Sequence, residues 1–324
     1  MDQTAIVDVT AIPAGDGMTV AADLAKAMIA AEKRNGLVLR GFVKGAVGDS
    51  DHHVLQGWAK EVCTALQRHK ECFKMSVYEG VGCKASEGFA AQLRRELRDK
   101  FRRLNPFGQG VAEDKMNGGL EALAKAIERM AALHAAALPP DEQTLPDMRY
   151  RAKIEVNFDG ACVKFHDDMV DVRLVTTLVG DGTVIADNTG VDWRYYFKCG
   201  GFLPDDAQVG RKRKNFSDVI REWNGRVVAS GEIACTPGDV GLMKGGKMTD
   251  RPCLHRAPYS ADEGSEFPRF LLTVERLESD TVQQFIEMEE DCSDSSGESD
   301  DNEEDEEMDE GDVATRTRSQ CNRA

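Results

Sequence analysis

Phe165-His166-Asp167-Asp168 is the stretch from which both the fold and the chemistry of this chain can be inferred. Apolar runs flank it, from Lys153 to Val163 before it and from Val170 to Val179 after it, so we expect the stretch to lie within a β-strand. Successive side chains of a strand point to opposite faces. The pattern therefore predicts that His166 and Asp168 share one face, with an imidazole beside a carboxylate.

Further β-like runs occur from about residue 150 to residue 278, and glycine-containing turns separate them. These runs are Val172 to Val179, Arg226 to Ile233, Gly238 to Met243 and Phe270 to Leu277. Residues 184–225 interrupt them, and we expect this segment to be a long irregular insert. It holds Trp193-Arg194-Tyr195-Tyr196 and a basic run, Arg211-Lys212-Arg213-Lys214, which fits an exposed loop or a minimal nuclear import signal.

The first 148 residues instead carry apolar side chains at helical spacing. The predicted helices are 18–34, a helix beginning near Asp51, 86–104 and 118–138, with a short strand at 36–43. The helix at 86–104 has a basic face, which could bind an anion or nucleic acid but which we interpret as a solvated face. His134 lies on or beside an apolar stripe, so we expect a packed core histidine and not a ligand. The pattern predicts an α+β protein with a mainly helical region, 1–148, packed on a β-rich core, 149–279.

The negative charge is concentrated at the C-terminal end. The formal net charge is −16, and residues 287–324, with 16 Asp or Glu and 3 Arg, account for −13 of it, which leaves −3 for residues 1–286. An acidic segment with few apolar residues cannot bury enough surface to offset its chain entropy, so we expect 280–324 to be a disordered tail. Such a tail would solubilise the protein or bind basic proteins. No clear nucleic-acid-binding pattern accompanies it.

Cysteine usage and hydropathy indicate the compartment. The nine cysteines are an odd number and include no C-x-x-C pair, which is typical of free thiols in a reducing environment. No stretch approaches the ~18 consecutive apolar residues of a membrane span, and Met1-Asp2-Gln3 does not begin a secretory signal. We expect an intracellular protein of the cytoplasm or nucleus, with no membrane association.

Two downstream residues complete a possible metal site. His255 lies in Cys253-Leu254-His255-Arg256, and Arg269 opens the last apolar run. Two histidines and one carboxylate form the facial triad of non-haem Fe(II) sites, which leaves coordination positions open. Cys253, two residues before His255, would favour zinc if it were a ligand, although a buried bystander thiol is the alternative. Structural roles for His166 and Asp168 are the other alternative.

The order H-x-D, a distal H and then an arginine resembles the Fe(II)/2-oxoglutarate-dependent oxygenases, whose core is a double-stranded β-helix of the cupin or jelly-roll type. The resemblance implies that His166, Asp168 and His255 bind the metal and that Arg269 binds the far carboxylate of 2-oxoglutarate. An ordinary ion pair is the alternative for Arg269. Arg269 follows His255 by 14 residues, which requires an added turn at 260–266.

A second similarity concerns the strand after the H-x-D motif. Arg173-x-x-Thr176 is similar to the corresponding strand of prolyl-hydroxylase-like members, which implies cofactor-binding roles for Arg173 and Thr176.

More closely, residues 153–277 resemble a family catalogued only as a domain of unknown function. The resemblance covers well over a third of the chain. The shared pieces are Phe165-His166-x-Asp168, Arg173-Leu174, Gly180-x-Gly182-Thr183, Gly238-Asp239-Val240 with Lys244-Gly245, His255-Arg256-x-Pro258 and Arg269-x-Leu271-Leu272.

Two classes of function follow. The first is an oxygenase of the hydroxylase or demethylase type that uses Fe(II), or alternatively Zn²⁺ or Mn²⁺, with 2-oxoglutarate. Its substrate would be a small molecule or a protein side chain, and the insert would act as a lid in which Trp193 and Tyr195 are pocket candidates. The second is a non-catalytic, cupin-like module for metal binding or protein interaction.

Overall fold

The structure is a computed structural model that describes residues 4–9, 17–32, 34–69, 73–78, 94, 95, 98, 113–138, 148–158, 162–201, 216–259, 268–278 and 281. The predicted helix at 86–104 lies almost wholly outside these residues. So do the basic run at 211–214, the added turn at 260–266 and, except for Thr281, the acidic tail. Among the described residues, no helix is both long enough and apolar enough to cross a membrane.

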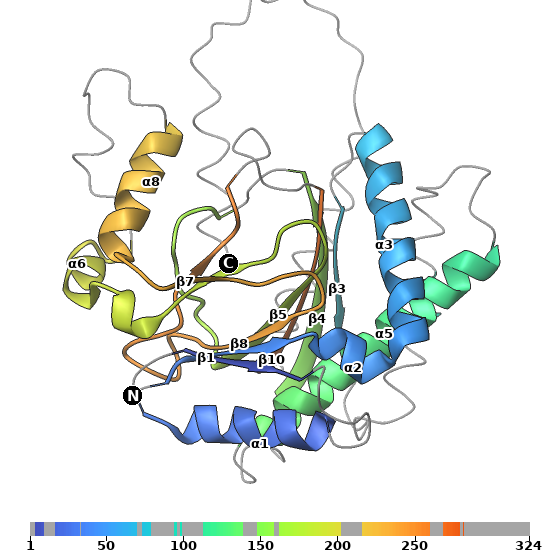
Figure 1. The fold of residues 1–324 in the computed structure, drawn as a ribbon, viewed down its shortest axis with the longest axis horizontal. Coiled ribbons are helices and arrows are strands. Elements are labelled where there is room, and N and C mark those ends of the chain that lie inside the picture. Colours follow the sequence, from blue (N-terminus) through green and yellow to red (C-terminus); the bar gives the residue numbers. More distant parts are fainter. Residues whose placement is uncertain are drawn as a thin grey trace, which may run out of the picture.

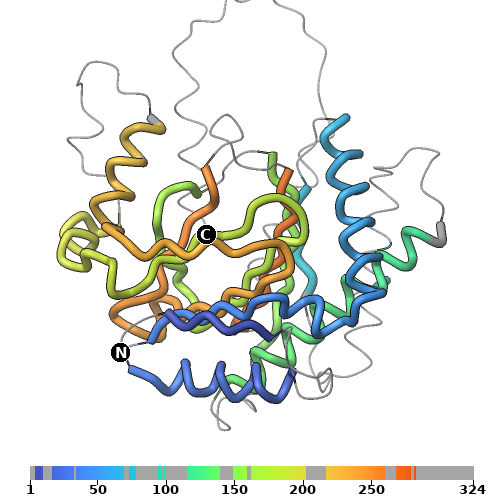
Figure 2. Tube along the Cα trace, viewed as in Figure 1, coloured from blue at the N-terminus to red at the C-terminus, as the bar shows by residue number. Residues whose placement is uncertain are grey.

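A large mixed sheet organises the fold (Figure 1). Its strand order is β1-β2-β8-β5-β10-β4-β3, and only the β1–β2 pair among its described pairings is parallel. The strands are β1 (Ala5–Asp8), β2 (Gly36–Arg40), β3 (Phe73–Tyr78), β4 (Met148–Asn157), β5 (Val172–Val179), β8 (Val240–Lys244) and β10 (Arg269–Glu278). Figure 2 shows the blue N-terminal strands running beside the orange segment that contains β8. The N-terminal region is therefore not only helical, because three of its strands extend the sheet of the core.

A small sheet faces the large one and has the order β7-β6-β9. Its strands are β6 (Val184–Ala186), β7 (Glu232–Ala234) and β9 (His255–Arg256). An isolated antiparallel bridge between His166 and His255 adds the H-x-D segment beside β9. From β4 onward the chain passes repeatedly from one sheet to the other: β4, the His166 bridge, β5, β6 and β7, β8, β9, β10.

Four N-terminal helices pack on the large sheet (Figure 1). They are α1 (Gly17–Ala30), α2 (Phe42–Val47), α3 (Asp49–His69) and α5 (Glu113–Ala137), and their apolar faces share one core with β2 to β5, β8 and β10. α3 and α5 approach closely, because a Cβ atom on Gly119 would lie 2.1 Å from Trp58 Cγ. The expected core role of His134 is confirmed: it is buried, and its Nε2 lies 3.1 Å from the Val172 carbonyl oxygen.

Where it is described, at 184–201 and 216–225, the segment expected to be irregular is largely helix and strand. It contributes β6, a 3-10 turn (Asn188–Gly190), α6 (Trp193–Lys198) and most of α8 (Phe216–Val227). Most of the strand expected from Arg226 to Ile233 is wrong, because α8 continues to Val227 and only the last two residues belong to a strand, β7. Ile220, Trp223 and Val227 recur at helical spacing and are all buried, so the helical period dominates there. The strand expected at 36–43 also ends early, since Gly41 adopts a φ of 65° and turns the chain into α2.

Candidate metal centre

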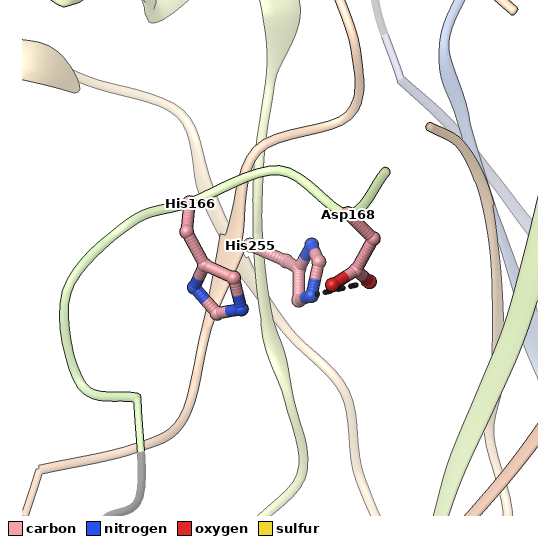
Figure 3. A group of neighbouring side chains, drawn as sticks. All are labelled: His166, Asp168 and His255. Atoms are coloured by element: carbon pink, nitrogen blue, oxygen red, sulfur yellow. Dashed lines mark ion pairs between the residues drawn. The ribbon is translucent and has the colours of Figure 1, made fainter. Parts of the chain in front are cut away.

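Three side chains from two separate segments meet between the sheets (Figure 3). One potential ligand atom from each of His166, Asp168 and His255 lies within 4.8 Å of the other two. His255 Nε2 is 3.2 Å from Asp168 Oδ2, and the two imidazole centroids are 4.5 Å apart. Adjacent ligands of an octahedral ion with metal–ligand bonds of ~2.1 Å are separated by roughly 3 Å. The distance between His255 and Asp168 matches this spacing, and all three ligand atoms are close enough together to hold one metal ion.

The backbone brings the two histidines opposite each other. His166 N donates to His255 O at 3.0 Å, and His255 N donates to His166 O at 2.9 Å. This reciprocal pair is an isolated bridge, so the expectation that residues 165–168 lie within a continuous strand is wrong. Beyond His166 the chain bonds to a turn instead, because Gly246 N donates to Asp168 O at 2.8 Å. A Cβ on the neighbouring Gly245 would lie 2.1 Å from Val170 O, so this close approach requires glycine.

Both imidazoles are held in the tautomer that a metal needs. His166 Nδ1 lies 2.9 Å from Lys164 O, and His255 Nδ1 lies 3.2 Å from Cys253 O. A carbonyl oxygen can only accept, so each Nδ1 carries a proton, and a neutral ring in this orientation has its lone pair on Nε2. Burial, reinforced by the nearby His255, lowers the pKa of His166 to about 4, so this ring is neutral near pH 7.

The neighbours of Asp168 keep its carboxylate ionised. Burial alone would raise its pKa, but His255 and Arg173 outweigh burial and hold the pKa well below its ordinary value. Arg173 Nη1 lies 2.6 Å from Asp168 Oδ2. Neither this contact nor the one from His255 has hydrogen-bond geometry, so Oδ2 is compensated by charge without being hydrogen-bonded to a described group. An ionised oxygen in this state can still bind a cation.

A row of buried charges supports Arg173. Glu275 on β10 lies directly opposite Arg151 on β4 and Arg173 on β5. Its Oε1 accepts from Arg151 Nε and its Oε2 from Arg173 Nε, each at 2.7 Å. Glu275 and Arg151 were not predicted from the sequence. The signal that could have found them is the acid that interrupts the apolar run of β10, together with an arginine in each neighbouring strand.

Asn224 on α8 fixes the segment that precedes His166, and it was not predicted either. Its side chain is 1% exposed. Its Oδ1 accepts from Phe165 N at 2.9 Å, and its Nδ2 donates to Val163 O at 2.9 Å and to Tyr259 Oη at 3.2 Å. The H-x-D segment is therefore clamped to a helix in the part of the chain that was expected to be an irregular insert.

Arg269, at the start of β10, is a buried cation whose partners are weak. Its Nε donates to Asp181 O at 2.7 Å, and its Nη2 lies 3.5 Å from the hydroxyls of Thr177 and Thr183. No carboxylate of a described residue lies within 4.0 Å of its guanidinium group. Burial lowers the pKa of Arg269 to about 10, so the side chain stays charged near pH 7. This environment suits an incoming anion.

The other predicted cofactor residues lie apart from Arg269. Thr176 lies on the opposite face of β5 from Thr177, on the side of Leu174 and Leu178, which belong to the main core. Its buried hydroxyl has no hydrogen-bond partner within the described part of the chain. Arg173 is occupied by Asp168 and Glu275.

The insert places different aromatic residues near the site from those predicted. Trp193 and Tyr195 are only partly buried against a second core under α6 and α8. Tyr196 and Phe197 instead line a cavity that also includes Asp167. Cys253 is buried in an apolar cluster and burial raises the pKa of its thiol, so it is a neutral bystander and not one of the three converging groups.

Comparison with known proteins places the chain in a family. Residues 91–275, more than half of the chain, match the family described as "Protein of unknown function (DUF1826)", so the chain belongs to this family. The matched region includes His166, Asp168, His255 and Arg269. No protein with a curated description matches the sequence.

Several solved structures are similar to the chain at low identity. A dioxygenase for auxin oxidation from Arabidopsis thaliana, as a complex with 2-oxoglutarate, is 11% identical over 85% of this chain and 92% of that chain, with a TM-score of 0.40. A protein from Caulobacter crescentus, described as of the 2OG-Fe(II) oxygenase family, is 11% identical over 84% and 85%, with a TM-score of 0.40. The Fe(II)/α-ketoglutarate-dependent dioxygenase TqaL is 10% identical over 83% and 91%, with a TM-score of 0.39. Similarity at this level does not establish a common fold or activity.

Proposed function

We propose that this member of the DUF1826 family is an Fe(II)- and 2-oxoglutarate-dependent oxygenase of the hydroxylase or demethylase type. The observation that carries the proposal is the convergence of two imidazoles, each oriented with Nδ1 on a carbonyl oxygen and Nε2 as the potential metal ligand, on one ionised carboxylate. This donor set is that of a facial triad, which leaves positions open for a co-substrate. Arg269 supplies a separate buried positive charge for the co-substrate.

The order of the strands supports a double-stranded β-helix. In the large sheet the relevant order is β8-β5-β10-β4, and in the small sheet it is β7-β6-β9 followed by the His166 segment. The chain reaches these positions by passing between the two facing sheets, as it does in jelly-roll folds. The candidate ligands then lie on the small sheet and its edge, where the two sheets enclose them.

Each residue of the candidate site has a defined role in this proposal. His166 and His255 would hold the metal through Nε2, and Asp168 through its carboxylate. Iron(II) bound there would supply the open coordination positions at which oxygen and the 2-oxoacid react. Arg269 would bind the distant carboxylate of 2-oxoglutarate by a charge-assisted contact. Arg173 would orient Asp168.

The donors favour iron over zinc. The site offers nitrogen and oxygen ligands, and its nearby cysteine is a neutral, buried thiol. The zinc sites that depend on a cysteine thiolate are therefore not available here, whereas two histidines with one carboxylate and open positions suit Fe(II). Mn²⁺ accepts the same donors and is the practical substitute in air.

Metal titration combined with 2-oxoglutarate turnover tests the proposal. We expect the purified chain to bind one Fe(II) or Mn²⁺ and, with Fe(II) in air, to form succinate from 2-oxoglutarate even without substrate. His166→Ala and His255→Ala should abolish both, while His53→Ala, at an exposed histidine on α3, should change neither. Unchanged metal content in His166→Ala would refute the assignment.

A non-catalytic module is the second candidate, and one observation favours it. Arg173 Nη1 already lies 2.6 Å from Asp168 Oδ2, so the charge of the carboxylate is compensated without any metal. In that case the charged row would be a structural element of the core. Tight zinc binding, or no metal binding, together with no succinate would select this alternative.

A further inference from the structure

A cavity of about 540 Å³ is lined by residues that are close in the chain to the candidate metal ligands Asp168 and His255. Three segments line it. The first is residues 167–169, the second is α6 at Tyr196 and Phe197, and the third is residues 246–252 between β8 and β9. The first contains Asp168, and the third leads into His255. Gly246 N also donates to Asp168 O at 2.8 Å, which joins these two segments directly. Two of the segments that line the cavity therefore also carry or lead into residues of the candidate metal centre.

Asp167 presents a fixed carboxylate in this cavity. The Tyr196 hydroxyl donates to Asp167 Oδ1, and Tyr196 is itself only 4% exposed, so the donor cannot move away. No other described group donates to either oxygen of Asp167, which leaves Oδ2 available as an acceptor. Asp250 adds a second carboxylate to the lining and Arg251 one guanidinium, so the charged side chains of the lining sum to −1.

The same cavity gathers exposed apolar side chains. Among the described residues, four large hydrophobic side chains are exposed: Ile6, Val54, Met169 and Phe197. Two of them, Met169 at 64% and Phe197 at 51%, line this cavity from different segments. Exposed apolar groups that converge beside a few oriented polar groups are typical of ligand sites. The ligand must therefore satisfy apolar walls and an acceptor with negative charge together.

We propose that this cavity binds the substrate, and that the substrate presents a cationic alkyl group, chemically the side chain of lysine or arginine. Its ammonium or guanidinium group contacts Asp167 and Asp250, and its methylene groups contact Met169 and Phe197. The role of the ligand as substrate rests on the proposed oxygenase function, whereas its binding does not. A guanidinium or ammonium is matched by a carboxylate through charge-assisted hydrogen bonds, which a neutral chain of the same length cannot form.

Binding of blocked amino acids to the full, metal-free chain tests the chemistry of the cavity. The probes are the Nα-acetyl methylamides of lysine, arginine, norleucine and glutamate, titrated by NMR or calorimetry. We expect the lysine or arginine probe to bind about tenfold more tightly than norleucine, with an advantage that decreases as salt is added. Norleucine or glutamate binding as tightly as both basic probes would overturn the proposal.

Variants locate the binding. Asp167→Asn keeps an acceptor for Tyr196 but removes the charge, and we expect it to weaken the basic probe about fivefold or more. Asp250→Asn, at an exposed residue that carries little risk of misfolding, should weaken it in the same direction. Asp218→Asn, at an exposed acid on α8, is the control and should change nothing. Unchanged affinity in both cavity variants would overturn the assignment.

Metal titration of the same samples separates this proposal from the proposed function. His166→Ala should lose metal and still bind the basic probe, because it leaves the lining of the cavity intact. A chain that binds the basic probe selectively but no metal would refute the oxygenase and support the cavity. A chain that binds Fe(II) and consumes 2-oxoglutarate, but shows no preference for basic probes, would refute the cavity alone.

Discussion

Replacing Glu275 with glutamine tests whether a row of buried charges holds Asp168 in place. Glu275 is 1% exposed and lies between Arg151 and Arg173, with both Nε atoms 2.7 Å from its carboxylate. Arg173 in turn contacts Asp168. Glutamine has the same shape, so the substitution removes the negative charge between two guanidinium groups without opening a cavity.

We expect Glu275→Gln to lower the free energy of unfolding substantially, although it changes only one group of the side chain. Removing one partner of a buried ion pair costs ~3–5 kcal/mol, because the other charge remains buried. The side chain of Arg173 is 17% exposed and retains Asp168, so we take the lower end, about 3 kcal/mol, of a total stability of ~5–15 kcal/mol. Urea unfolding at pH 7 measures it. Glu278→Gln, at an exposed acid on the same strand, is the matched control and should stay within about 0.5 kcal/mol of wild type.

The pH dependence and the metal provide two further readouts. Burial opposes ionisation of Glu275, but Arg173 and Arg151 outweigh it and lower the pKa below the ordinary 4.5. A carboxyl with a lowered folded-state pKa stabilises the fold above its unfolded pKa and loses that contribution as the pH falls through the folded one. The difference between wild type and Glu275→Gln should therefore shrink below pH 4.5. Metal affinity should fall about tenfold, since Arg173 then competes fully for Asp168. A change below about 1 kcal/mol at pH 7 would refute the reasoning.

Three other predictions concern Asn224, His134 and Arg269. Asn224→Ala should weaken Fe(II) or Mn²⁺ binding about tenfold in a metal titration, because the segment before His166 loses its clamp; unchanged affinity would count against this role. Burial lowers the pKa of His134 to about 4 from an ordinary 6.5, so the unfolded chain binds the extra proton between these values and stability falls as the pH drops from 6.5 to about 4. His134→Asn should remove up to ~3 kcal/mol of that pH dependence in unfolding experiments, and an unaltered profile would contradict it. Arg269→Met should weaken 2-oxoglutarate binding by roughly 10- to 100-fold in calorimetry and leave Mn²⁺ affinity unchanged; equal loss of both would indicate a general disturbance of the core.

The sequence was most informative where one period dominates a segment. The apolar stripe of 118–138 predicts α5, and the apolar runs predict β5 and β10 within a few residues, because each element buries one continuous face. It was least informative between 184 and 231, where short strands of three residues flank two helices. Such strands are defined by pairing with distant segments, which a local pattern does not contain.

Some residues of the candidate site can be predicted from the sequence and others cannot. His166, Asp168 and His255 can be selected because histidine is rare in this chain and its chemistry is specific. Glu275 and Arg151 cannot, because their pairing depends on the register of two strands whose residues are 124 positions apart. The local sequence also does not decide whether Tyr195 or Tyr196 faces Asp167, since consecutive side chains of a helix point about 100° apart. Only the placement of α6 decides that Tyr196 faces Asp167.

The position of β10 in the large sheet has a consequence for how the protein is made. This strand, the last among the described residues, lies between β4 and β5, which are synthesised about a hundred residues earlier, so the native sheet cannot connect these two strands until the chain has emerged to Glu278. Until then each exposes a long edge that can pair with another nascent chain. Closing such distant pairs is slow, because the loop entropy is lost before the contacts form. A ribosome stalled before residue 269 would thus release an aggregation-prone product.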